Sequence, residues 1–103
     1  MNFGLSEAIH EEFRRVFADF PEIEEVLIFG SRAKGGFRDG SDIDLAAFAP
    51  TMMDSRFTEL WQAVDDLPLV FKVDLLHWDR LGNLALRDRI VQEGRPFFTP
   101  GRP

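Results

Sequence analysis

Two short motifs decide the fold of this chain: Gly30-Ser31-Arg32-Ala33-Lys34-Gly35 and, after a loop, Ser41-Asp42-Ile43-Asp44-Leu45. The first motif follows the apolar run from Val26 to Phe29, and such a run is typical of a strand buried on both faces. The second motif leads into a predicted strand from Ile43 to Phe48. Glycine and serine therefore follow one strand directly, and two aspartates stand at the start of the next.

The two aspartates are spaced for a metal site. Residues two apart on a strand point to the same face, so Asp42 and Asp44 are expected to project together. Adjacent carboxylates repel each other, and a divalent cation such as Mg²⁺ removes that repulsion. Asp74 lies in a third apolar strand, where an unpartnered carboxylate would be costly. If the two strands are neighbours, the three aspartates form one metal site.

The glycine-serine motif has the features of a phosphate site. Gly30 lets a phosphate approach the backbone, and a helical turn that begins at Ser31 would present N–H groups to the anion. The Ser31 hydroxyl can donate to a phosphate oxygen, and Arg32 and Lys34 are the nearest cations. The combined pattern predicts a metal-triphosphate site.

Each feature also has an ordinary structural explanation. Gly30-Ser31 could be a simple turn, Asp42 a cap and Asp44 a surface residue at a strand end. Asp74 could form a salt bridge with Lys72 or with an arginine of the last helix. The basic residues could belong to a solvated loop. The joint spacing favours the metal-triphosphate interpretation over these separate ones.

The remaining pattern predicts three long helices and one further short strand. The helices are expected over residues 6–20, 54–64 and 83–93, with Ser6, Asp54 and Asn83 as their N-caps. Leu86, Ile90 and Val91 are expected to face inward. The third strand is expected over residues 69–78 and a short edge segment over 96–98, followed by a flexible tail over 99–103. These elements predict a single α/β (α+β) domain over residues 1–103, a small three- to four-stranded mixed sheet flanked by helices.

Composition narrows the classes of function. The net charge of −6 argues against extended binding of nucleic acid, which depends on Lys and Arg. No apolar stretch is long enough to span a bilayer. There is no cysteine, which fits a reducing cytoplasm, the expected location.

The quoted motifs resemble those of the DNA polymerase β-like nucleotidyltransferase superfamily, and most of all its minimal nucleotidyltransferases. That signature is Gly-Ser, a spacer, Asp-x-Asp and a third Asp on a later strand, here Asp74. The resemblance implies the polymerase β-like fold, ATP as substrate and the use of two Mg²⁺ ions. It implies that Asp42, Asp44 and Asp74 are catalytic and bind metal. The nucleotide-binding residues would be Gly30, Ser31, Arg32, Lys34 and Ser41.

The resemblance also implies an acceptor. Minimal nucleotidyltransferases are commonly paired with a helical HEPN protein, and some act as antitoxins that transfer AMP to a tyrosine of that toxin. This chain has no Tyr, so a tyrosine acceptor must belong to another molecule, within a hetero-oligomer. Two alternatives stay open: a non-catalytic antitoxin that only binds its partner, and a transferase that modifies a small molecule such as an aminoglycoside.

Aromatic residues are the candidates for a partner surface, and histidines for an added catalytic role. Trp61, Trp78, Phe97 and Phe98 could form an interface, although core packing is preferred for Trp61 and Phe97. For His10 and His77, a structural or surface role is preferred to a catalytic one.

Overall fold

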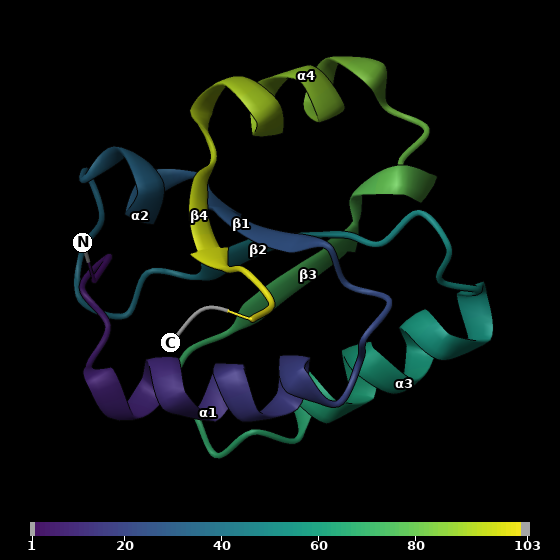
Figure 1. Ribbon diagram of the computed structural model, residues 1–103. Helices are drawn as coiled ribbons and strands as arrows, with labels where there is room; N and C mark the ends of the chain where they lie inside the picture. The colour runs from purple at the N-terminus through teal and green to yellow at the C-terminus, as the bar shows by residue number, and fades with distance from the viewer. Residues whose placement is uncertain (1, 102–103) are drawn as a thin grey trace.

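The chain forms one four-stranded sheet with helices on both faces, described here from a computed structural model over residues 2–101 (Figure 1). The strands lie in the order β3-β2-β1-β4; β2 and β3 are parallel and the other neighbours are antiparallel. This is the predicted mixed sheet of an α+β domain. In chain order the elements are α1 (Glu7–Ala18), β1 (Glu25–Phe29), α2 (Ser31–Lys34), β2 (Ile43–Phe48), α3 (Asp54–Asp65), β3 (Val73–His77), the 3-10 turn η1 (Trp78–Arg80), α4 (Leu84–Glu93) and β4 (Arg95–Phe98).

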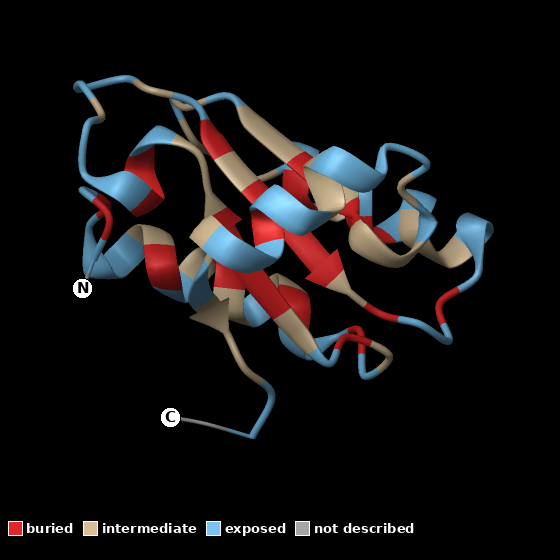
Figure 2. Ribbon diagram, turned by 90° about the horizontal axis from the view of Figure 1, so that it is seen from above, coloured by how far each residue is buried: buried red, intermediate tan, exposed pale blue. Residues whose placement is uncertain are grey.

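The two faces of the sheet are covered differently (Figure 1). Helices α1 and α3 lie together on one face, where Phe13 and Phe17 of α1 and Leu60 of α3 enter the main core. Helix α4 lies alone on the other face and contributes Ile90 to a small cluster with Leu27 and Ala46. In Figure 2 buried residues run along the central strands under α4, whose outer surface is exposed. Alternation along β2 explains the division, because Ile43, Leu45 and Ala47 face the main core while Ala46 faces α4.

The predicted helix starts are confirmed at two of three positions. The Ser6 hydroxyl accepts a hydrogen bond from the Ile9 N–H, and the Asn83 side chain accepts one from the Leu86 N–H. The third prediction is wrong, since Met53 is the N-cap of α3 and Asp54 is its first residue. Asp54 still benefits α3, because a carboxylate in the first turn complements the helix dipole.

The predicted third strand is too long. Strand β3 covers only Val73–His77, and residues 69–72 form a bend that leads into it. Leu69 and Phe71 pack against the main core from this bend, whereas Val70 points outward and is 94% exposed. Apolar content alone suggested a strand, but Leu69 and Phe71 pack their side chains on the core from outside the strand.

Two side chains expected inside lie outside. Val91 of α4 is 56% exposed and Trp61 of α3 is 43% exposed. Phe97, by contrast, packs on Phe13 and on His10 as predicted. Among residues 2–101 no helix combines the length and apolarity required to cross a bilayer. Of the predicted tail, residues 99–101 are described, whereas 102 and 103 lie outside the described residues.

Candidate active site

The strand register brings two of the predicted aspartates together. Asp44 of β2 lies directly beside Asp74 of β3 and, on its other side, beside Phe29 of β1. Both carboxylates therefore stand on the face that carries α4, beyond the end of the small cluster under that helix. The adjacency of β2 and β3, on which the three-aspartate prediction depended, is present.

Gly30 is required where β1 ends. Its φ is +74°, a conformation that side chains disfavour, and it caps the short helix α2. A Cβ atom placed on this residue would lie 2.5 Å from Oδ2 of Asp44. The glycine thus allows the backbone at the start of α2 to lie against the carboxylate, which brings the two sequence motifs into contact.

The Asp44 carboxyl has a raised pKa because it is partly buried and lies near other carboxylates. Burial raises the pKa of its carboxyl, and the negative charges of Asp74 and Asp42 raise that pKa further. Lys72 opposes the shift, with its Nζ 3.9 Å from Oδ1 of Asp74. One exposed lysine at that distance compensates weakly, so the site carries excess negative charge.

Asp42 does not share a strand with this pair. It is exposed and belongs to the loop that precedes β2, not to the strand itself. Within residues 2–101, no three His, Cys, Asp or Glu side chains are close enough together to form a ready metal site. The fold therefore places Asp44 and Asp74 side by side on neighbouring strands, with Asp42 in the adjoining loop, where its charge raises the pKa of Asp44.

A cavity of about 440 Å³ opens beside Gly30 and Asp44. Ser31 and Lys34 of α2, two of the residues predicted to bind nucleotide, line one side of it. Helix α4 lines the other side, with Leu86, Arg89 and Glu93. Glu93 holds Lys34 through an ion pair of 3.0 Å between Oε1 and Nζ.

Arg89 and Glu93 were missed by the sequence analysis. Residues 86, 89 and 93 fall on one stripe of a helix, a spacing that is visible in the sequence. Nothing in the sequence, however, indicates that this stripe would face Gly30. That requires the packing of Ile90 on Leu27, which turns the flank of α4 toward α2.

Arg32 is placed in the interior and not in the cavity. It is 2% exposed, and its Nε and Nη2 donate to the Ser41 carbonyl at 3.1 and 2.9 Å. Its Nη1 donates to the Phe3 carbonyl at 3.0 Å, and its guanidinium lies 4.9 Å from the centre of the Phe71 ring. Every nitrogen at its tip is thus used within the fold. Arg32 ties the loop before Asp42 to the body of the protein.

Ser41 supports the same loop. Its hydroxyl accepts a hydrogen bond of 2.8 Å from the Arg38 N–H, which closes the turn before Asp42. His77 lies on the opposite face of the sheet, where its Nε2 is 2.8 Å from the Ala49 carbonyl and its ring stacks on Phe57. His10 is buried and its Nε2 lies 3.0 Å from the Asn2 carbonyl. Both histidines have the structural roles that were preferred.

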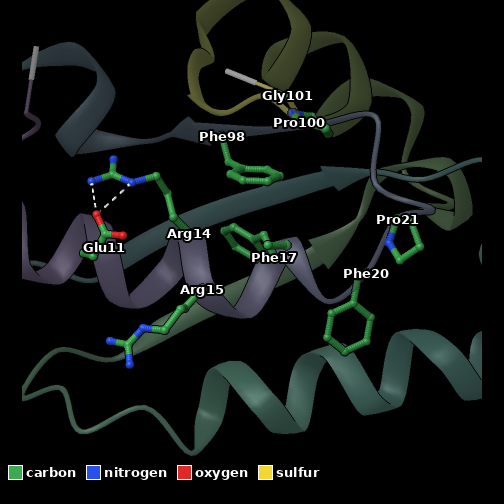
Figure 3. A pocket seen from close by; sticks show the side chains of 10 residues that line it. Glu11, Arg14, Arg15, Phe17, Phe20, Pro21, Phe98, Pro100 and Gly101 are labelled. Atoms are coloured by element: carbon green, nitrogen blue, oxygen red, sulfur yellow. Dashed lines mark hydrogen bonds and ion pairs between the residues drawn. The ribbon is translucent and has the colours of Figure 1, made fainter. Parts of the chain in front are cut away.

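A larger hollow lies away from these carboxylates. Its volume is about 530 Å³, and it is formed by α1, the end of β4 and the chain after β4 (Figure 3). Phe17, Phe20 and Phe98 form its apolar wall, and its acid Glu11 is bonded to Arg14. Because it contains neither Gly30 nor any of the three aspartates, its size does not make it the catalytic site.

Comparison with known proteins shows the family to which the fold belongs. Residues 11–101 match the family model described as Polymerase beta, Nucleotidyltransferase. No curated protein sequence matches this chain significantly.

Several solved structures have the same fold. A toxin-antitoxin complex with AMP-PNP is 24% identical, with a TM-score of 0.70, over 89% of this chain and 74% of that one. A mutant MntA–HpeT toxin-antitoxin complex is 26% identical, with a TM-score of 0.66, over 94% and 75%. The complex of tri-AMPylated Shewanella oneidensis HEPN toxin with MNT antitoxin is 20% identical, with a TM-score of 0.61, over 92% and 73%.

Proposed function

Because this chain belongs to the polymerase β nucleotidyltransferase family, we propose that it transfers AMP from ATP to a tyrosine hydroxyl of a HEPN-type toxin. It would thereby act as the antitoxin of that partner. The observation that carries this proposal is the adjacency of Asp44 and Asp74 beside Gly30, with a cavity on the Gly30 side. The similar toxin-antitoxin complexes, one of them with an AMPylated HEPN toxin, support the choice of acceptor.

The cavity supplies the nucleotide-binding groups. Backbone N–H groups at the start of α2, the Ser31 hydroxyl and Lys34 would hold the outer phosphates. Arg89 would add a second cation from α4. Arg32 and Ser41 act indirectly in this proposal, because they hold the loop that carries Asp42.

The carboxylates fit Mg²⁺ by their chemistry. They are oxygen donors, they crowd one another, and Asp44 resists ionisation in the absence of a cation. Asp44 and Asp74 would hold the ion, and Asp42 would join them when its loop closes on the bound nucleotide. Bound Mg²⁺, as one or two ions, would neutralise charge on the carboxylates and on the triphosphate.

The reaction itself is a displacement at phosphorus. The acceptor oxygen forms a bond to the α-phosphorus of ATP, and the bond from that phosphorus to the bridging oxygen of the β-phosphate breaks. Pyrophosphate leaves, and the proton of the acceptor hydroxyl passes to the Asp74 carboxylate and then to water. Lys34 and Arg89, which line the cavity, would offset the negative charge that gathers on the leaving group.

The test is transfer of label from ATP carrying radioactive α-phosphate. The purified chain is incubated with the protein encoded by the neighbouring gene and Mg²⁺, and label on the partner is measured. We expect label with the wild type and none with a double variant carrying Asp42→Asn and Asp44→Asn. Asp39→Asn removes one exposed acid from the same loop and serves as the matched control. Binding of the partner without any label transfer by the wild type would contradict the proposal.

A non-catalytic antitoxin is the second candidate. The exposed side chains of Trp61 and Val70 favour a partner-binding surface whether or not the chain is active. If the double asparagine variant neutralises the toxin as well as the wild type does, binding alone explains the antitoxin effect.

A further inference from the structure

Glu93 is an acid that lines the same cavity as the groups proposed to hold the triphosphate. The cavity beside Gly30 is lined by two cations, Lys34 and Arg89, and by two acids, Asp44 and Glu93. The formal charges of these four side chains cancel, so the cavity attracts an anion less than its two cations alone would. Asp44 serves as a ligand of Mg²⁺ in the proposed function, whereas Glu93 has no part in it.

The position of Glu93 in α4 is unfavourable for the helix itself. Glu93 is the last residue of α4, and the last turn of this helix contains no basic residue. The helix dipole favours cations and disfavours a carboxylate at the C-terminal end of a helix. Departures from such local rules are expected where a residue serves a functional site. The stability of α4 alone therefore does not explain an acid at this position.

The packing of α4 on the sheet brings Glu93 to α2. Gly94 follows the helix, and a Cβ atom on this residue would lie 2.9 Å from Cδ1 of Leu27 in β1. Because Gly94 has no side chain, the end of α4 can approach β1, the strand that leads into Gly30 and α2. The Glu93 carboxylate there reaches Lys34, with Oε1 3.0 Å from Nζ.

The ion pair engages the charge of Lys34 before any phosphate reaches it. Arg89, in contrast, forms no ion pair within residues 2–101. The Lys34 and Glu93 side chains are 59% and 34% exposed, so the pair is weak enough to be exchanged for another partner. A phosphate that binds Lys34 must replace the Glu93 carboxylate. This step rests on the proposed function, because the position of the triphosphate comes from it.

We propose that Glu93 competes with phosphate groups for Lys34, and so lowers the affinity of the cavity for the triphosphate and for pyrophosphate. Release of product limits the turnover of many enzymes, and pyrophosphate held tightly by Lys34 would block the next ATP molecule. Glu93 supplies a carboxylate that pairs with Lys34 again as pyrophosphate leaves. Its effect is on affinity, and it takes no part in the bond-forming step.

Glu93→Gln is the main test variant, because it removes the charge and keeps the shape of the side chain. Binding of inorganic pyrophosphate and of ATP is measured separately by calorimetry, with Mg²⁺ at constant ionic strength and without a partner protein. We expect the variant to bind each ligand about three- to fivefold more tightly, the range for release of one partly exposed ion pair.

Asp88→Asn is the matched control, since it removes one exposed acid from the same helix, outside the lining of the cavity. It should change each affinity by less than about 1.5-fold, because solvent and salt screen a charge that does not contact the ligand. An equal gain for Asp88→Asn would overturn the specific role of Glu93.

The same change in a Lys34→Gln background tests whether Glu93 acts through Lys34. Without the lysine, Glu93→Gln should raise each affinity by less than about 1.5-fold, since the interaction between the two residues is already absent. An equal gain in both backgrounds would show a general effect of charge and would overturn the competition for Lys34.

Melting temperatures of all variants show whether each is folded at the temperature of the binding measurement. Unchanged or weaker binding by Glu93→Gln, together with AMP transfer by the wild type, would overturn the role of Glu93 and leave the proposed function intact. Failure of the wild type to bind either ligand would contradict both.

Discussion

The two faces of the sheet differ in how completely they are covered and in the side chains that they carry. The face under α1 and α3 is filled with large apolar side chains, and Phe13, Phe17 and Leu60 are at most 1% exposed there. The face under α4 has a small cluster around Ile90, and beyond it the sheet presents Asp44 and Asp74. One face is covered by closely packed apolar side chains, whereas the other is partly open and carries two carboxylates of like charge.

The difference shows where stability and chemistry can be separated. Apolar burial on the first face holds the strands in register, and that register places two carboxylates side by side on the second. The crowding itself opposes folding, because ionised acids repel each other. A site of this kind depends on stability supplied elsewhere in the fold.

The largest expected effect on stability is on the packed face. Phe13→Ala should lower the free energy of unfolding by about 3–5 kcal/mol, the usual cost of truncating a buried phenylalanine. Leu86→Ala on the α4 face should cost only about 1 kcal/mol, because Leu86 is partly exposed. Urea unfolding of both variants measures the contrast. Equal losses would show that the two faces contribute alike.

The next effect concerns activity. Asp44→Asn should reduce AMP transfer about 10²–10³-fold, comparable to loss of one key electrostatic group in an active site. Its melting temperature without divalent metal should equal or exceed that of the wild type, since a repelled charge has been removed. Activity assays and calorimetry on the same preparation test both parts. A lower melting temperature would mean that Asp44 supports the fold.

Arg32 ties the loop before Asp42 to the packed face, and its loss should have an intermediate effect. Arg32→Met should lower the free energy of unfolding by about 2–3 kcal/mol, because the carbonyls of Phe3 and Ser41 lose their donors. The matched change Arg38→Met alters an exposed arginine of the same loop and should cost less than about 0.5 kcal/mol. Similar values for the two variants would contradict a structural role for Arg32.

The smallest effect is the dependence of stability on pH. The pKa of Asp44 is raised in the folded state, so the folded protein binds more protons than the unfolded chain between the two pKa values. The resulting contribution of Asp44 to the free energy of unfolding is stabilising and fully present below the unfolded pKa of about 3.9. It is lost as pH rises through the folded pKa.

The measurement is the difference in melting temperature between Asp44→Asn and the wild type, without divalent metal. As pH rises, the melting temperature of the variant should increase relative to that of the wild type. The increase should be no more than about 3 °C, since solvent screens the partly exposed Asp44 carboxylate. Addition of Mg²⁺ should stabilise the wild type more than the variant. A difference that grows toward acid pH would reverse the sign and contradict the assignment.

Much of the fold could be predicted from the sequence. The period of apolar residues in α1, the runs of β1 and β2, and the caps at Ser6 and Asn83 are local signals, so they appear without knowledge of the tertiary structure. The bend before β3 was misassigned because Leu69 and Phe71 are apolar for packing and not for strand pairing. Trp61 was expected inside but is 43% exposed, because only the packing of α3 decides which of its apolar side chains are covered.

The sequence by itself determined which chemical groups are available: glycine and serine after a strand, two aspartates at the start of the next, and a third in an apolar strand. This pattern is recognised from the spacing of residues along the sequence, so it can be seen without the structure. Only the tertiary structure decided which groups meet. It set Asp74 beside Asp44 through the parallel pairing of β2 and β3, took Arg32 into the interior and brought Arg89 to the cavity beside Gly30 and Asp44. The reason is physical, because these contacts join segments far apart in the chain and depend on how the packed face fixes the sheet.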